Sequence, residues 1–138
     1  MPEELVTRRC EEADIESVLE LWVAAGSTPS KTDTTDDLKT TINSQAATVI
    51  VAVSGGTIAG SVIAAFDGWR GSRLAVSPDH QRQGIARRLL TEGEAWLRSR
   101  GAKRVEAVVE KDHPWATGFW DSTEFYLEPM DLRYVRDL

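Results

Sequence analysis

The sequence has little cysteine and histidine and no apolar run long enough to cross a membrane. The single cysteine, Cys10, excludes an intrachain disulfide and a thiolate metal cluster, and two histidines are too few for a histidine-rich metal site. The longest apolar runs, such as residues 61–66, are far shorter than a membrane-spanning helix. The N-terminus lacks the basic and apolar regions of a signal peptide. We therefore expect a cytoplasmic protein without a bound metal.

A basic surface for nucleic acid is also lacking, because the formal net charge is −6. The charges are unevenly distributed: residues 70–104 contain nine basic and three acidic residues, and the rest of the chain contains seven basic and nineteen acidic ones. Two interpretations stay open. The basic residues form a chance cluster on solvated faces, or they bind a polyanionic ligand while a cationic partner approaches the acidic remainder.

The chain of 138 residues is long enough for one domain with its own core, so we expect a single domain over residues 1–138. Residues 5–10 alternate as an opening strand. Asp14 is a candidate N-cap for a helix in which Ile15, Val18, Leu19 and Trp22 follow the spacing of an amphipathic stripe. A second, weaker helix is expected over residues 36–43.

The middle of the chain changes to the period of β-strands. The β-branched residues 48–53, the turn signal Gly55-Gly56 and the long run 57–66 predict a hairpin, followed by a turn and a strand over residues 72–76. The clearest helix covers residues 85–100, with Gly101 placed after its end. We expect a strand at 104–109, a short helix at 115–121 and a final strand or hairpin at 124–135. This order predicts a mixed α/β fold in which the long helix is a crossover.

The most informative motif lies between the strand predicted at residues 72–76 and the helix predicted at residues 85–100. Helix N-termini expose unpaired backbone N–H groups and a partial positive charge, which together bind phosphate. Gly84 permits close backbone approach, and residues 81–88 contain three arginines and no acidic residue. The patterns of a P-loop and of a dinucleotide-binding loop are both absent.

This stretch resembles the acyl-CoA-binding motif of the GNAT superfamily of N-acetyltransferases, [Q/R]-x-x-G-x-[G/A], which residues 81–86 match without a gap. Weaker similarities accompany it. They are the R-x-A-x-x-x-D opening at residues 8–14, a G-x-x strand at 60–63, an F-Y-x-x-x-G-F segment at 119–125, and the D-G-x-R-G loop of short bacterial members at 67–71.

The resemblance implies a GNAT-like α/β fold: a mixed, mostly antiparallel central sheet flanked by helices, with a splayed, V-shaped cofactor cleft between the fourth and fifth strands. It implies acetyl-CoA or another acyl-CoA as co-substrate, its pantetheine lying beside the fourth strand like an added strand. The residues implied in cofactor binding are Leu74, Ala75, Val76, Gln81, Arg82, Gln83, Gly84, Ile85, Ala86 and Arg87, with Arg88 as an alternative to Arg87.

Acyl transfer to an amine requires a deprotonated amine, a polarised thioester carbonyl and a proton for the leaving thiolate. A backbone N–H near Val76 is the candidate oxyanion donor. Trp120 stands where most family members have a tyrosine thought to protonate the thiolate, and an indole N–H is not an acid at physiological pH. Tyr126, a water molecule or an unprotonated thiolate are the alternatives, and Trp120 is then a packing aromatic.

The remaining catalytic candidates are a histidine and three carboxylates. His113 stands where relatives often have asparagine, and it is either a base or pantetheine contact or a residue that caps its own loop. Glu106 is the best candidate for the base, ahead of Asp67 and Glu110, although exposed carboxylates are commonly only solvated.

Three functions remain in competition. The first is an N-acetyltransferase that acts on a small-molecule or peptide amine by a ternary-complex mechanism. The second is an acyl-CoA-binding regulatory module that has lost turnover, and the third is an interaction domain without a cofactor. The acidic balance outside the basic segment favours a cationic acceptor, and a monomer and a homodimer are both compatible with the sequence.

Overall fold

The computed structural model describes residues 4–27, 29–78, 84–113 and 115–138. It contains two compact units, which we call the larger unit (Met1–Val108) and the C-terminal unit (Val109–Leu138). The larger unit holds β1 (Leu5–Arg9), η1 (Glu12–Asp14), α1 (Ile15–Ala24), α2 (Thr35–Ile42), β2 (Ala47–Ser54), β3 (Thr57–Phe66), β4 (Ser72–Pro78), α3 (Ile85–Ser99) and β5 (Glu106–Ala107). The C-terminal unit holds α4 (Ala116–Asp121).

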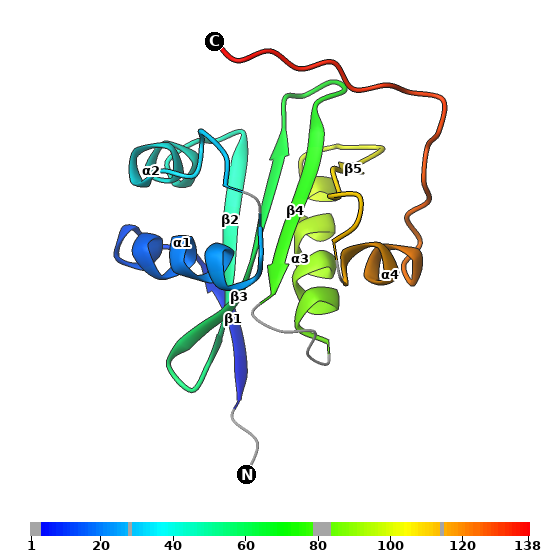
Figure 1. Ribbon diagram of the computed structural model, residues 1–138. Coiled ribbons are helices and arrows are strands. Elements are labelled where there is room, and N and C mark those ends of the chain that lie inside the picture. The colour runs from blue at the N-terminus through cyan, green and yellow to red at the C-terminus, as the bar shows by residue number, and fades with distance from the viewer. Residues whose placement is uncertain (1–3, 28, 79–83, 114) are drawn as a thin grey trace. The chain divides into compact units, whose positions relative to one another are not determined.

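The five strands form one sheet in the order β1-β2-β3-β4-β5. The first three neighbouring pairs are antiparallel, and β4 and β5 are parallel. Figure 1 shows α1 and α2 against one face of this sheet and α3 against the other. The predicted mixed, mostly antiparallel sheet flanked by helices is therefore confirmed.

Apolar side chains fill both faces of the sheet. Ile15 and Val18 of α1 and Leu38 of α2 pack with Val49 and Val51 of β2 in one buried cluster. Since each fully buried aliphatic side chain contributes about 1.5–3 kcal/mol, this cluster holds the two helices on the sheet.

The opposite face packs α3 unusually closely, through two glycines. A Cβ on Gly93 of α3 would lie 2.5 Å from Leu74 Cδ2, and a Cβ on Gly60 of β3 would lie 2.8 Å from Leu89 Cδ1. Both distances are too short for real contacts, so a side chain at either position would require Leu74 or Leu89, or the helix itself, to shift. The two glycines thus set the position of α3 relative to β3 and β4.

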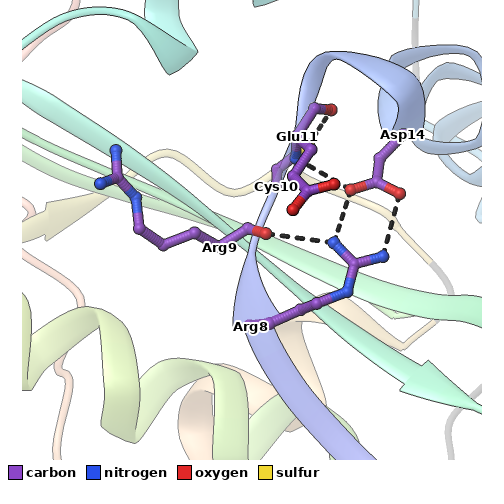
Figure 2. A network of polar contacts seen from close by, with 5 residues as sticks. All are labelled: Arg8, Arg9, Cys10, Glu11 and Asp14. Carbon is purple, nitrogen blue, oxygen red and sulfur yellow. Dashed lines mark hydrogen bonds and ion pairs between the residues drawn. The ribbon is translucent and has the colours of Figure 1, made fainter.

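The entry into α1 depends on a polar network around Asp14 (Figure 2). Arg8 donates two hydrogen bonds to the Asp14 carboxylate, at 2.6 and 3.0 Å, and the Glu11 N–H donates a third at 2.8 Å. The hydrogen bond from Arg8 is the main reason why the pKa of Asp14 lies below its usual value. Asp14 is the N-cap residue of α1, as predicted, but its side chain caps no N–H of α1 and instead ties the end of β1 to η1.

Cys10 lies within this turn but is buried, with 5% of its surface exposed. Burial raises the pKa of its thiol to about 11, so the thiol stays protonated near neutral pH. Cys10 is therefore a core residue.

Two of the strand predictions are wrong: one strand is shorter than expected and the other does not form. Strand β5 is two residues long, whereas residues 104–109 were expected to be extended throughout. Residues 124–135, expected to form a strand or hairpin, contain no strand, and the exposed side chains there include Tyr126, Leu127, Met130, Leu132 and Tyr134. A strand requires a partner for its backbone, and an alternating sequence does not supply one.

Candidate active site

The N-terminus of α3 is built from Gly84 and the two buried residues that follow it. Gly84 is the N-cap, with φ +85°, a left-handed conformation that L-residues with side chains rarely adopt. Its carbonyl accepts a 2.8 Å hydrogen bond from the Arg88 N–H, which closes the first turn. Ile85 and Ala86 are buried and fix this turn to the core.

Among the described residues, no side chain accepts a hydrogen bond from the first N–H groups of this helix. No side chain caps Gly84's helix, and the first turn contains no acidic residue. The first N–H groups of a helix point along its axis and carry a partial positive charge. An anion outside the helix, such as a phosphate, is the natural acceptor for them.

Two exposed arginines occupy this first turn. Arg88 donates a 2.7 Å hydrogen bond to the Leu5 carbonyl on β1, and its Nε lies 3.9 Å from Glu92 Oε1. Arg87 and Arg88 both remain candidates for contact with a phosphate. Gln81, Arg82 and Gln83, the other residues of the predicted loop, lie outside the described residues.

The direction of the β4 backbone follows from the hydrogen bonds of β3. The Phe66 N–H bonds to the Ala46 carbonyl on the β2 side, at 2.9 Å. Backbone groups alternate along an antiparallel strand, so Phe66, Ala64 and Val62 point to β2, and the residues between them point to β4. With the observed β3–β4 register, Ala75 then points to β3, whereas Leu74 and Val76 point away from it.

The outer edge of β4 is paired only at its beginning. The parallel β4–β5 ladder comprises Arg73 with Glu106 and Leu74 with Ala107. Val76 lies beyond the last pair, so its backbone N–H and carbonyl face an edge where the described strands offer no partner. Such an edge can accept an extended ligand, as an added strand would be accepted. Two strands that diverge from each other would also stop pairing after a few residues.

Glu106 forms an ion pair across β4 and β5. Its Oε1 lies 3.2 Å from Arg73 Nε, and both side chains are about two-thirds exposed, at 61% and 66%. Arg73 was not predicted as a site residue, because a partner on a neighbouring strand leaves no local signal in the sequence. Asp67, the alternative carboxylate, accepts hydrogen bonds from the backbone N–H groups of Trp69 and Gly71 at 2.8 and 3.0 Å, and so braces its own turn.

The C-terminal unit contains the other three catalytic candidates. Trp120 is half-buried and packs edge-to-face with Phe119 and Phe125, at ring-centroid distances of 5.2 and 4.8 Å. His113 Nδ1 accepts a long, 3.5 Å hydrogen bond from the Trp115 N–H, and the two rings are also in contact. Tyr126 is 73% exposed. The surroundings of Trp120 and His113 are those of a packing aromatic and of a residue that caps its own loop.

Within the described part of the chain, no group of three or more histidine, cysteine, aspartate or glutamate side chains could hold a metal ion. None of the helices in that same part is long and apolar enough to span a membrane.

Comparison with known proteins identifies the family. The model of the acetyltransferase (GNAT) family matches residues 15–125. An acetyltransferase of Pectobacterium atrosepticum is 32% identical over 114 residues, with 81% of each chain covered. One of Yersinia pseudotuberculosis is 31% identical over 114 residues, again with 81% of each chain covered.

Solved structures share the fold at lower identity. PaiA N-acetyltransferase from Thermoplasma acidophilum in complex with coenzyme A has a TM-score of 0.78 at 17% identity, with 93% of each chain covered. An aminoglycoside acetyltransferase from an uncultured soil metagenomic sample, in complex with sisomicin, has a TM-score of 0.75 at 21% identity, with 97% of this chain and 96% of that one covered. The chain belongs to the GNAT family of acetyltransferases.

Proposed function

We propose that this chain transfers an acyl group, acetyl in the simplest case, from acyl-CoA directly to a primary amine within a ternary complex. The observation that carries the proposal is the path from the unpaired edge of β4 at Val76 to the uncapped, acid-free N-terminus of α3 at Gly84. An extended pantetheine chain matches the first feature and a diphosphate the second. Membership of an acetyltransferase family supports this assignment of the two features.

The larger unit contributes the groups that bind the diphosphate, polarise the thioester carbonyl and accept the amine proton. The N–H groups of Ile85 and Ala86 bind the diphosphate, and Arg87 neutralises part of its charge. The outward N–H of Val76 donates to the thioester carbonyl oxygen as negative charge develops on it. Glu106 accepts the amine proton through a water molecule. The ion pair with Arg73 holds the Glu106 side chain beside β4.

The two compact units act together in this proposal, as one acyltransferase domain over residues 1–138. The support is the family match, whose residues 15–125 extend from α1 in the larger unit to Phe125 in the C-terminal unit. The C-terminal unit contributes the aromatic cluster around Trp120 and, through Tyr126, the candidate acid.

The acceptor amine is protonated in solution and approaches as a cation. Exposed acidic side chains are frequent around α1 and α2 and would raise its local concentration; they include Glu11, Glu12, Glu16, Glu20, Asp36 and Asp37. A structural relative binds sisomicin, an aminoglycoside, so polyamines and aminoglycosides belong in any set of test acceptors.

A regulatory module that binds acyl-CoA without turnover is the second candidate. Its support is Trp120, which packs in an aromatic cluster and cannot supply the proton that a tyrosine could. The two functions share the cofactor site and differ only in turnover.

One pair of assays separates the candidates. A thermal-shift titration with acetyl-CoA tests cofactor binding, and CoA thiol release over a panel of amines tests transfer. The enzyme gives both signals, the regulatory module gives only the thermal shift, and an interaction domain gives neither. Thiol release that depends on enzyme and on amine would establish the transferase, whereas a thermal shift without release from any amine would favour the regulatory module.

A further inference from the structure

We propose that Trp69 and Arg70, on the turn between β3 and β4, bind a carboxylate of the acyl acceptor. This inference rests on the proposed function and specifies the acceptor as an amine that also carries a carboxylate, as an amino acid or the C-terminus of a peptide does. The turn covers residues 67–71 and connects β3 to β4.

The turn is rigid although it is exposed. Asp67 Oδ1 accepts from the N–H groups of Trp69 and Gly71, and the Asp67 N–H donates to the Gly71 carbonyl at 3.0 Å. A Cβ at Gly71 would overlap Asp67 Oδ2, so a side chain at this position would displace the carboxylate that braces the turn. Trp69 is thus presented on a braced turn with 76% of its surface exposed.

Arg70 is held against Trp69 and has no acidic partner among the described residues. Its guanidinium carbon lies 4.7 Å from the centre of the Trp69 ring. Stacking on a ring uses the face of the guanidinium and leaves the N–H donors in its plane available. Asp67, the nearest acid in sequence, is directed at the backbone of the turn instead. A planar carboxylate matches the donors that remain, in a bidentate geometry.

The position of the turn assigns it to the acceptor and not to acyl-CoA. Strand β4 has seven residues, so the turn lies about 20 Å from the α3 N-terminus, where the diphosphate is proposed to bind. The turn instead adjoins the end of β4 that pairs with β5, beside the Arg73–Glu106 ion pair. A ligand that contacts Arg70 therefore lies at the same end of β4 as Glu106, the proposed base.

The test measures thiol release with acceptor pairs that differ only in the carboxylate: 6-aminohexanoate against 6-aminohexanamide, lysine against lysinamide, and a dipeptide against its C-terminal amide. The free amino acids and the dipeptide distinguish the two sources of the carboxylate. We expect the acids to be preferred by about 10- to 100-fold in kcat/KM, mainly through KM, which is the usual effect of a hydrogen bond to a charged group.

Two matched variants decide whether Arg70 is responsible. Arg70→Gln should remove the preference and leave the KM for acetyl-CoA unchanged. Arg100→Gln is the control, because Arg100 stacks on Trp96 in the same way, at 4.8 Å, at the far end of α3. It should keep the preference. Equal use of acids and amides by the wild type, or a preference that survives in Arg70→Gln, would overturn the proposal.

A binding measurement keeps this inference separate from the proposed function. Calorimetric titration of 6-acetamidohexanoate and of its amide, in the presence of CoA, reports on the carboxylate even if no amine is turned over. Absence of turnover would contradict the proposed transferase. Tighter binding of the acid to the wild type and to Arg100→Gln, lost in Arg70→Gln, would still support the carboxylate site, and equal binding of acid and amide would refute it.

Discussion

Helices α2 and α3 pack on the same sheet but begin with different chemistry. At α2, Thr34 is the N-cap and its Oγ1 accepts from the Asp37 N–H at 3.1 Å, with Asp36 and Asp37 in the first turn. At α3, Gly84 provides no capping side chain, and Arg87 stands at the third helical position, where α2 has Asp37. The short helix α4 also lacks a side-chain cap, but Ala116, Thr117 and Gly118 in its first turn are uncharged.

The difference indicates which helix start is complete without a ligand. Capping side chains and acids near an N-terminus each stabilise a helix, by about 1 and 0.3–1 kcal/mol respectively. Helix α2 obtains both contributions from its own residues, and α3 obtains neither from the residues that the structure describes. A bound diphosphate would supply both at α3, which explains why basic residues are tolerated there.

The largest effect is expected on kcat, from a change at Tyr126 that should leave cofactor binding at α3 intact. If Tyr126 is the general acid, Tyr126→Phe should lower kcat by about 10²–10⁴-fold and leave the KM for acetyl-CoA nearly unchanged. Steady-state thiol release measures both quantities. Tyr134→Phe is the control, because Tyr134 is also exposed and should tolerate the change.

Wild-type turnover in Tyr126→Phe would leave water or an unprotonated thiolate as the route. In that case Trp120→Phe should also keep most of the activity, because Phe preserves an aromatic ring between Phe119 and Phe125.

The next effect tests the charge at Gly84. Gly84→Asp places a carboxylate where a phosphate is proposed, so the dissociation constant for acetyl-CoA should rise on the order of 100-fold. Gly84→Asn is nearly isosteric and tolerates a positive φ, so it reports the cost of the side chain without the charge. Calorimetric titration of both variants gives the ratio.

The same pair also distinguishes the empty from the occupied helix. Without acetyl-CoA, Gly84→Asp should be about 0.3–1 kcal/mol more stable than Gly84→Asn, because an acid favours a helix N-terminus. With acetyl-CoA, the order should reverse. Equal acetyl-CoA affinity of the two variants would show that no anion binds at α3.

A smaller effect, on stability, is expected from removing the charge of the Asp14 carboxylate at η1. Asp14→Asn should lower the free energy of unfolding at pH 7 by about 1–2 kcal/mol, because the hydrogen bonds of Asp14 to Arg8 and Glu11 lose their charge. Urea unfolding measures this difference. Glu12→Gln is the control, since Glu12 and Lys39 are 3.9 Å apart and both 55% exposed, and it should change stability little.

The contribution of Asp14 should also depend on pH. Its pKa is lower in the folded state than in the unfolded chain, where it is close to 3.8. The stabilisation is therefore fully present above about pH 4 and is lost as the pH falls through the lower, folded-state pKa. The gap between wild type and Asp14→Asn should narrow on acidification, and a gap that widens would contradict this assignment.

The smallest expected effect breaks the cap of α2. Thr34→Ala should cost about 1 kcal/mol of stability, because the Asp37 N–H loses its acceptor. Acetyl-CoA affinity should not change, since α2 does not contribute to the proposed site. A loss of affinity like that of Gly84→Asp would remove the distinction between the two helices.

The helices and the hairpin turn with a clear local sequence signal were predicted correctly. The stripe from Ile15 to Trp22, the Gly55-Gly56 turn and the helix that begins at Ile85 are all observed within one or two residues of their predicted limits. Their signals are periodicity and turn chemistry, which short segments carry by themselves. The resemblance of residues 81–86 to the acyl-CoA motif likewise indicated the family correctly.

Long-range partners could not be predicted from the sequence. The hydrogen bond of Arg88 to the Leu5 carbonyl joins residues 83 positions apart and leaves no local signal in the sequence. Asp14 has the spacing of an N-cap, but Arg8 on β1 determines its role. Residues 124–135 were expected to form a strand or hairpin, yet no strand forms there. In each case, the deciding partner lies on another element, and a local pattern does not identify it.

The most direct test of the account is an amide NMR titration of ¹⁵N-labelled protein with CoA. If the diphosphate binds at α3 and the pantetheine lies along β4, the resonances of Gly84, Ile85, Ala86 and Val76 should show the largest shifts. Those of Thr35, Asp36 and Asp37 at the capped start of α2 should stay in place. Shifts concentrated away from Val76 and the start of α3, or no shifts at saturating CoA, would contradict the account.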